Sequence, residues 1–104
     1  MGIVETPAFT RQIARLLTDV EYWELQDVLA AHPDAGDLIP HGCGLRKLRW
    51  AFPGQAKGKR GGIRVIYYWQ EGTMLYLITA YAKSKQENLT QAQMKAFVRT
   101  IRGE

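Results

Sequence analysis

The sequence predicts an α+β fold in which an N-terminal helical hairpin and a C-terminal helix pack on a mainly antiparallel sheet. Three observations support this. Apolar residues recur at helical spacing in three segments, three other segments are alternating or rich in β-branched residues, and the tight turn Glu71-Gly72 joins two of the latter. We expect the order strand, helix, helix, strand, strand, strand, helix in one domain that spans residues 1–104.

The N-terminal part begins with the β-branched segment Ile3–Glu5, which we predict as a strand. Thr6-Pro7 is a typical helix start, with threonine as the N-cap and proline at the first helical position. The helix that follows has one apolar face, made of Phe9, Ile13, Leu16 and Leu17. Thr18–Glu21 has the pattern of a capping box and starts a second helix. This helix should end just before Pro33, because proline disfavours helix in the residue that precedes it.

The C-terminal part contains three predicted strands and a helix. Leu45–Trp50 alternates, so that Leu45, Lys47 and Arg49 share one face, while Ile63–Trp69 and Thr73–Tyr81 continue a meander. A second capping-box pattern at Thr90 starts a helix whose apolar face is Met94, Phe97, Val98 and Ile101. We interpret Asp34–Asp37 as a turn. The large aromatic residues expected in the core are Phe9, Trp23 and Phe97.

Composition excludes several classes of protein. With 104 residues, 46% of them apolar and 23% charged, the chain is typical of one folded domain rather than a disordered one. No apolar run is long enough for a membrane span, and the N-terminus does not resemble a signal peptide. Cys43 is the single cysteine, and with His32 and His41 it matches no zinc spacing. We therefore expect a cytoplasmic protein without a metal or membrane association.

The charge is distributed unevenly along the chain. Residues 1–42 carry two basic and seven acidic side chains, a net charge of −5, whereas residues 43–104 carry twelve basic and three acidic ones, a net charge of +9. Seven cations fall between Leu45 and Arg64 with no acid among them. This asymmetry indicates a polyanionic partner, most often a nucleic acid, although a solvated basic surface would have the same composition.

The strand cations suggest where such a partner binds. Arg64 interrupts an otherwise apolar strand, so it either pairs with an acid of the N-terminal helices or lies on an open, anion-binding face. We favour the open face, because Lys47 and Arg49 are expected on an adjacent strand. Continued alternation places Lys83 on the same face as Tyr81. Trp50, Tyr68 and Tyr81 are expected either in the core or stacked on bases.

A basic loop lies between two of these strands. It contains Lys57, Lys59 and Arg60 among four glycines, and lacks both the residue order and the following helix of a P-loop. We expect it to touch phosphates without sequence preference, or else to be a plain hairpin loop. Lys85, just beyond the last strand, adds a further cation.

Three segments together resemble the RelE/HigB family of toxins from bacterial toxin–antitoxin pairs, and are most similar to the HigB branch. They are Gly44–Arg49, Lys57–Tyr68 and Leu77–Lys83. The resemblance covers nearly the whole chain and includes the order of elements. The sequence departs from some family members at two positions, with Ser84 in place of an arginine and Thr90 nearest to the place of a tyrosine.

The resemblance implies a RelE-like fold and a cytoplasmic toxin that cleaves mRNA on the ribosome without metal or cofactor. It also implies a cognate antitoxin, of the helix-turn-helix HigA type, which neutralises the toxin and contacts the operator DNA. Matched to the family, Lys47 and Arg49 fall at paired cations of the first meander strand, Arg64 at an arginine position of the next strand, and Lys83 at the cationic end of the last strand. As catalytic residues we expect Arg64, which would clamp the scissile phosphate, and Lys83 or Lys47, which would transfer protons. The residues expected to bind RNA or the ribosome are Arg49, Lys57, Lys59, Arg60, Tyr81 and Lys85.

Two alternatives remain open from the sequence. ParE toxins resemble RelE toxins in fold but poison DNA gyrase, and a non-catalytic RNA- or DNA-binding module would need the same basic face. The number of cations favours the nuclease, because a protein target does not require seven of them within twenty residues.

Overall fold

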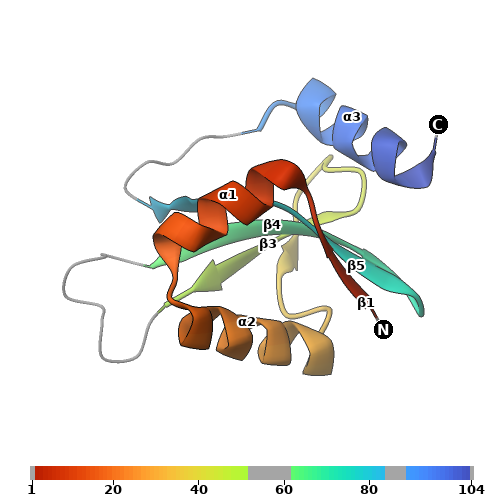
Figure 1. The fold of residues 1–104 in the computed structure, drawn as a ribbon. Helices are drawn as coiled ribbons and strands as arrows, with labels where there is room; N and C mark the ends of the chain where they lie inside the picture. Colours follow the sequence, from red (N-terminus) through yellow and green to blue (C-terminus); the bar gives the residue numbers. More distant parts are fainter. Residues whose placement is uncertain (1, 52–61, 84–88, 104) are drawn as a thin grey trace.

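The computed structural model describes residues 2–51, 62–83 and 89–103. Three helices and five strands follow one another along the chain (Figure 1). In order they are β1 (Gly2–Glu5), α1 (Pro7–Leu16), α2 (Asp19–Ala31), β2 (Asp37–Leu38), β3 (Leu45–Trp50), β4 (Ile63–Gln70), β5 (Met74–Ala82) and α3 (Gln91–Arg102).

The strands form one sheet in the order β1-β5-β4-β3-β2. All neighbouring strands are antiparallel except β1, which pairs with β5 in parallel. The α+β class and the β3-β4-β5 meander are therefore as predicted. The structure adds the short strand β2, at the end of a segment that was predicted as a turn. Two residues are too few to show the alternation by which a strand is recognised in a sequence.

The predicted helix starts are confirmed by side-chain caps. The Thr6 hydroxyl accepts a hydrogen bond from the Phe9 amide at 3.1 Å, with Pro7 at the first helical position of α1. Thr18 and Thr90 each form a complete capping box with the residue three positions later. These caps satisfy backbone amides that have no partner within the helix, and so define where each helix begins.

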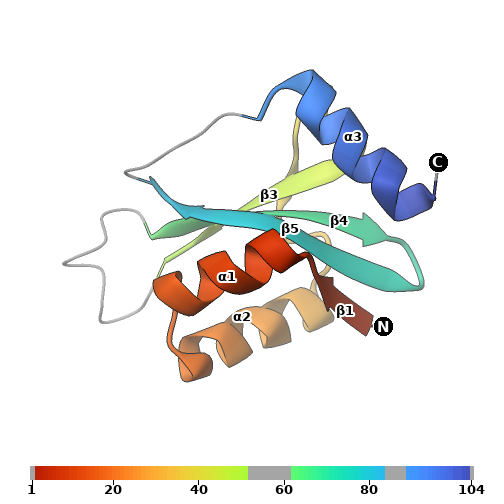
Figure 2. The same ribbon diagram turned by 45° about the horizontal axis from the view of Figure 1, so that its top comes forward.

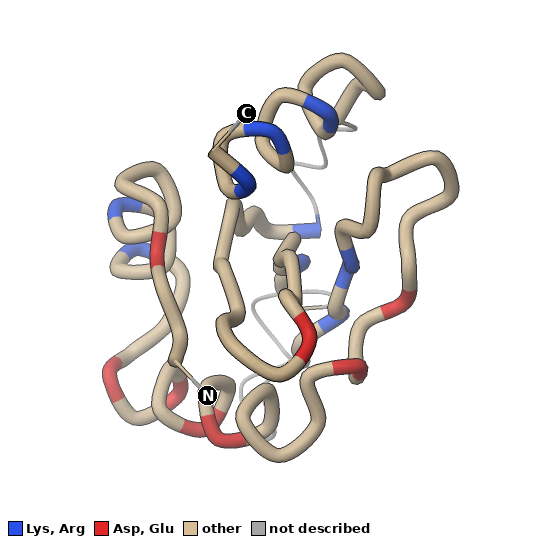
Figure 3. Tube along the Cα trace, turned by 90° about the vertical axis from the view of Figure 1, so that its right-hand side faces the viewer, with Lys and Arg blue, Asp and Glu red and all other residues tan. Residues whose placement is uncertain are grey.

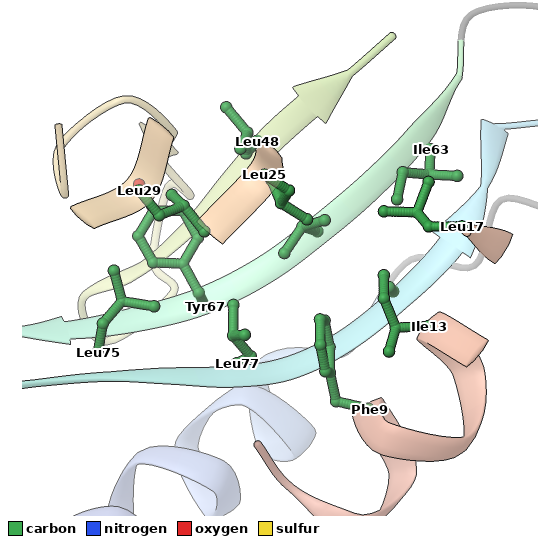
Figure 4. Close-up of a cluster of buried hydrophobic side chains, with 12 residues drawn as sticks. Phe9, Ile13, Leu17, Leu25, Leu29, Leu48, Ile63, Tyr67, Leu75 and Leu77 are labelled. Carbon is green, nitrogen blue, oxygen red and sulfur yellow. The ribbon is translucent and has the colours of Figure 1, made fainter. Parts of the chain in front are cut away.

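The helices cover both faces of the sheet (Figures 1 and 2). On one face, α1 and α2 enclose a core around Phe9, Leu25 and Tyr67, which are completely buried (Figure 4). On the opposite face, Met94 and Val98 of α3 pack against a smaller cluster from β3, β4 and β5: Leu45, Ile66 and Ile78. Alternation along each strand thus supplies both cores.

Tyr67 joins the larger core to the segment before β2. Its hydroxyl donates to the Pro33 carbonyl at 2.6 Å and accepts from the Gly36 amide at 2.8 Å. Burial is the main cause that raises the pKa of the Tyr67 phenol above its ordinary value. Through these bonds the core fixes the position of β2, the strand that flanks β3.

The prediction that Trp23 lies in the core is wrong. Trp23 is 61% exposed, whereas Leu25 and Leu29 of the same helix are completely buried. Two residues along a helix correspond to a rotation of about 200°, so Trp23 lies on the side of α2 opposite Leu25. Phe97 is half-buried against the cluster beneath α3, and Phe9 is buried as predicted.

Candidate nucleic-acid interface

The strand register places three of the predicted site residues in one row across the sheet. Arg49 of β3 lies opposite Arg64 of β4, which in turn lies opposite Tyr81 of β5. Residues directly opposite each other in an antiparallel sheet share a face. This is the face that α3 covers at its other end, because Ile66, two residues from Arg64, packs against the α3 cluster.

Two lysines flank this row, one on each side. Lys47 lies opposite Ile66, one row beyond Arg49 on the same face. Lys83 follows the end of β5, where its amide donates to the Gly62 carbonyl at 3.2 Å. Lys47 and Arg64 are half-buried, while Arg49 and Lys83 are exposed. The arginine row therefore lies between two lysine positions.

These side chains line a single hollow of about 220 Å³, which we call the cationic hollow. Its described lining consists of Lys47, Arg49, Arg64, Tyr81 and Lys83. No acidic side chain is among them. Arg64 also donates a long hydrogen bond of 3.4 Å to the Ile63 carbonyl. The structure thus brings together all three predicted catalytic residues and two of those predicted to bind RNA.

Four other predicted contact residues lie outside the described residues. They are Lys57, Lys59 and Arg60 of the basic loop, and Lys85. The loop connects the described ends of β3 and β4, and Lys85 follows Lys83 by two positions.

Tyr81 stands where three hollows meet. Besides the cationic hollow, it lines a hollow of about 230 Å³ with Lys47 and Met94, and a groove of about 520 Å³ between α1 and β5. The tyrosine is half-buried at this junction. The groove was not predicted from the sequence, because its polar residues on α1 occupy positions that a helical pattern assigns to solvent.

Arg46 shows that strand alternation separates the cations of β3. Its neighbour Lys47 lines the cationic hollow, whereas the Arg46 guanidinium lies on the other face and donates to the Gly36 carbonyl at 2.8 Å. Arg46 therefore has a structural contact near β2.

In the described trace the acidic positions concentrate along α2 and the adjoining turns (Figure 3).

Among the described residues, no three histidine, cysteine or acidic side chains are grouped so that they could hold a metal ion. None of the described helices is long and apolar enough to cross a membrane. The Thr90 hydroxyl accepts from the Gln93 amide, so this side chain serves as a helix cap. A scan against models of known protein families finds no match to this chain.

Proposed function

We propose that this chain is a ribosome-dependent endoribonuclease toxin of the RelE/HigB kind, held inactive in the cytoplasm by a cognate antitoxin that also contacts the operator DNA. The observation that carries the proposal is the cationic hollow, whose described lining is four cations and a tyrosine. Such a lining is suited to a phosphodiester. The resemblance of the sequence segments to this family supplies the choice of RNA as the substrate.

The reaction requires no group beyond those that lysine and arginine offer. The 2′-oxygen loses its proton and forms a bond to the adjacent phosphorus, while the bond from phosphorus to the 5′-oxygen breaks. The products are a 2′,3′-cyclic phosphate and a 5′-hydroxyl, whose oxygen takes up a proton. An enzyme must therefore move two protons and stabilise negative charge on the phosphate.

The positions of the two lysines fit this requirement. Lys47 lies on β3 and Lys83 directly follows the end of β5, the two strands that flank β4, so the lysines are one row to either side of the arginine row. From strand spacing and rise, their Cα atoms are about 17 Å apart, with Arg64 between them. A phosphate held by Arg64 would have one lysine near the attacking oxygen and the other near the leaving oxygen, which lie on opposite sides of phosphorus.

The remaining residues would hold the RNA around the scissile phosphate. Arg49, exposed beside Arg64, would contact a flanking phosphate. Tyr81 presents an aromatic ring at the edge of the cationic hollow and is suited to stacking on a base. In this proposal, further phosphates of the message or of ribosomal RNA are bound by the remaining predicted cations, Lys57, Lys59, Arg60 and Lys85.

The test expresses Arg64→Ala and Lys83→Ala variants without antitoxin and maps cuts in ribosome-bound message. We expect both to lose growth arrest and cleavage by at least about 100-fold, the usual effect of removing a proton-transfer or charge-stabilising group. The matched control is Arg99→Ala, which removes an exposed cation of α3 outside the hollow. It should leave cleavage unchanged. Circular dichroism checks that each variant folds.

The same strains separate the alternatives. Arrest with intact message but inhibited gyrase would favour a ParE-like toxin. Binding to translating ribosomes without cleavage by the parent protein would favour a non-catalytic RNA-binding module. Full cleavage by both variants would show that the cationic hollow is not the active site.

A further inference from the structure

The groove between α1 and β5 lies beside the cationic hollow and has a different character. Its volume is about 520 Å³, within the range of sites that hold small organic ligands. Its lining combines apolar residues with polar ones: Leu16, Ala80, Ala82 and Leu89, and Gln12, Arg15, Thr79 and Tyr81. Figure 2 shows α1 running alongside β5 at this edge of the sheet.

Gln12 has a defined orientation in this groove. β1 pairs with β5 only as far as Leu77, so the outer edge of β5 beyond that point has no strand neighbour in the described part of the chain. There the Gln12 side-chain oxygen accepts from the Ala80 amide at 2.8 Å and from the Thr79 hydroxyl at 3.1 Å. Because a backbone amide can only donate, the atom that faces it must be the oxygen.

The amide nitrogen of Gln12 therefore faces away from β5, and within the described residues it has no hydrogen-bond partner. It offers two N–H donors to whatever enters the groove. Because Tyr81 lines both the groove and the cationic hollow, the two sites are adjacent. A ligand with a planar, hydrogen-bonding part and an adjoining anion would fill both.

We propose that this groove is a nucleobase pocket for a nucleotide next to the phosphate held in the cationic hollow. The inference rests on the proposed function, which supplies the RNA. The Gln12 amide nitrogen donates to a ring nitrogen or carbonyl oxygen of the base, while Leu16, Leu89 and Ala82 contact its faces and edge. A peptide added as a further strand is disfavoured, because Gln12 already occupies the Ala80 amide that such a strand would need.

The test measures binding of RNA trinucleotides that carry a 2′-deoxy sugar at the cleavage position and so cannot be cut. One probe is intact, and three others each lack one base. Binding is measured at low salt by calorimetry. In the parent protein, we expect removal of one particular base to weaken binding about tenfold, a usual effect for one bound base.

Two variants alter the groove. Gln12→Glu keeps the acceptor oxygen for Ala80 but replaces the outward donor with an oxygen, and Ala82→Leu fills the groove. Each should weaken binding of the intact probe about tenfold and have a much smaller effect on the probe that lacks the critical base. The controls are Gln91→Glu and Ala14→Leu, the same exchanges at exposed positions outside the groove. They should show no difference between probes.

The outcomes distinguish this inference from the proposed function. Equal losses for intact and abasic probes would overturn the pocket, because they would reflect charge or general disturbance only. Variants without any effect on RNA binding, as expected if the groove accepts a peptide strand, would overturn it as well. Base-dependent binding by a parent protein that cuts no message would support the pocket and refute the nuclease.

Discussion

Removal of one hydroxyl group, in Tyr67→Phe, tests how the core fixes the strand that flanks the candidate site. The Tyr67 ring is completely buried, and its hydroxyl joins the Gly36 amide and the Pro33 carbonyl. Phenylalanine fills the same space but leaves both backbone groups without this partner. A buried polar group left unsatisfied costs about 1–3 kcal/mol, so we expect the free energy of unfolding to fall by about 2–4 kcal/mol.

Urea denaturation followed by circular dichroism measures this change. For a chain of this size it corresponds to a decrease in Tm of about 10 °C or more. The matched control is Tyr76→Phe, since Tyr76 is half-buried in the other core and its hydroxyl has no hydrogen bond within the described residues. That variant should change the free energy by less than about 0.5 kcal/mol.

A fall of less than about 0.5 kcal/mol for Tyr67→Phe would refute this reasoning, as would an equal fall for both variants. Hydrogen exchange adds an independent measurement. The amides of β2 and of the segment before it should lose protection in Tyr67→Phe but not in Tyr76→Phe, because only Tyr67 bonds to that segment.

Three further predictions follow from single contacts. Gly62→Ala should lower the free energy of unfolding by more than about 2 kcal/mol, because at φ +66° the added Cβ would lie 1.9 Å from the Trp50 carbonyl oxygen. The control is Gly72→Ala, where φ is +82° but no described atom beyond those of its chain neighbours lies within 4 Å of the added Cβ. This variant should lower the free energy of unfolding by only about 1 kcal/mol. Burial and the hydrogen bond to Glu5 raise the pKa of Tyr22, so above pH 10 the phenol loses its proton when the chain unfolds. The free energy of unfolding should therefore fall as the pH rises above 10. Urea titrations at alkaline pH should show a smaller fall for Tyr22→Phe. Arg49→Gln should reduce the slope of the logarithm of the RNA-binding constant against the logarithm of salt concentration by about one. It should also raise the free energy of unfolding by about 0.5 kcal/mol, because Arg49 lies directly opposite Arg64. Arg99→Gln should show neither effect.

Local sequence patterns predicted the helix starts and the faces of the strands, since both depend on neighbouring residues. Threonine caps at positions 6, 18 and 90 act over three residues, and the alternation that places Lys47 and Arg49 together acts over two. Trp23 shows the limit of this approach. Its size suggested burial, but its angular position on α2 relative to Leu25 decided its exposure.

Local sequence patterns could not predict how the site residues come together, because this depends on contacts between residues far apart in the chain. The alignment of Arg49 with Arg64 depends on the register between β3 and β4, and that of Arg64 with Tyr81 on the register between β4 and β5. The parallel pairing of β1 with β5 and the contact of Gln12 with Ala80 join residues more than 65 positions apart. A polar residue of α1 gives no sign in the sequence that it caps a strand edge.

The division of one sheet face into two parts explains how this small chain can hold a row of cations. Arg49 and Arg64 lie directly opposite each other, an arrangement that destabilises a sheet when the charges are alike. Where α3 covers the same face, Leu45, Ile66 and Ile78 pack against Met94 and Val98 and contribute apolar burial. The packed end can thus compensate for repulsion at the open end. A polyanion bound there would relieve the repulsion, so the feature that weakens the free protein is also the one that favours the complex.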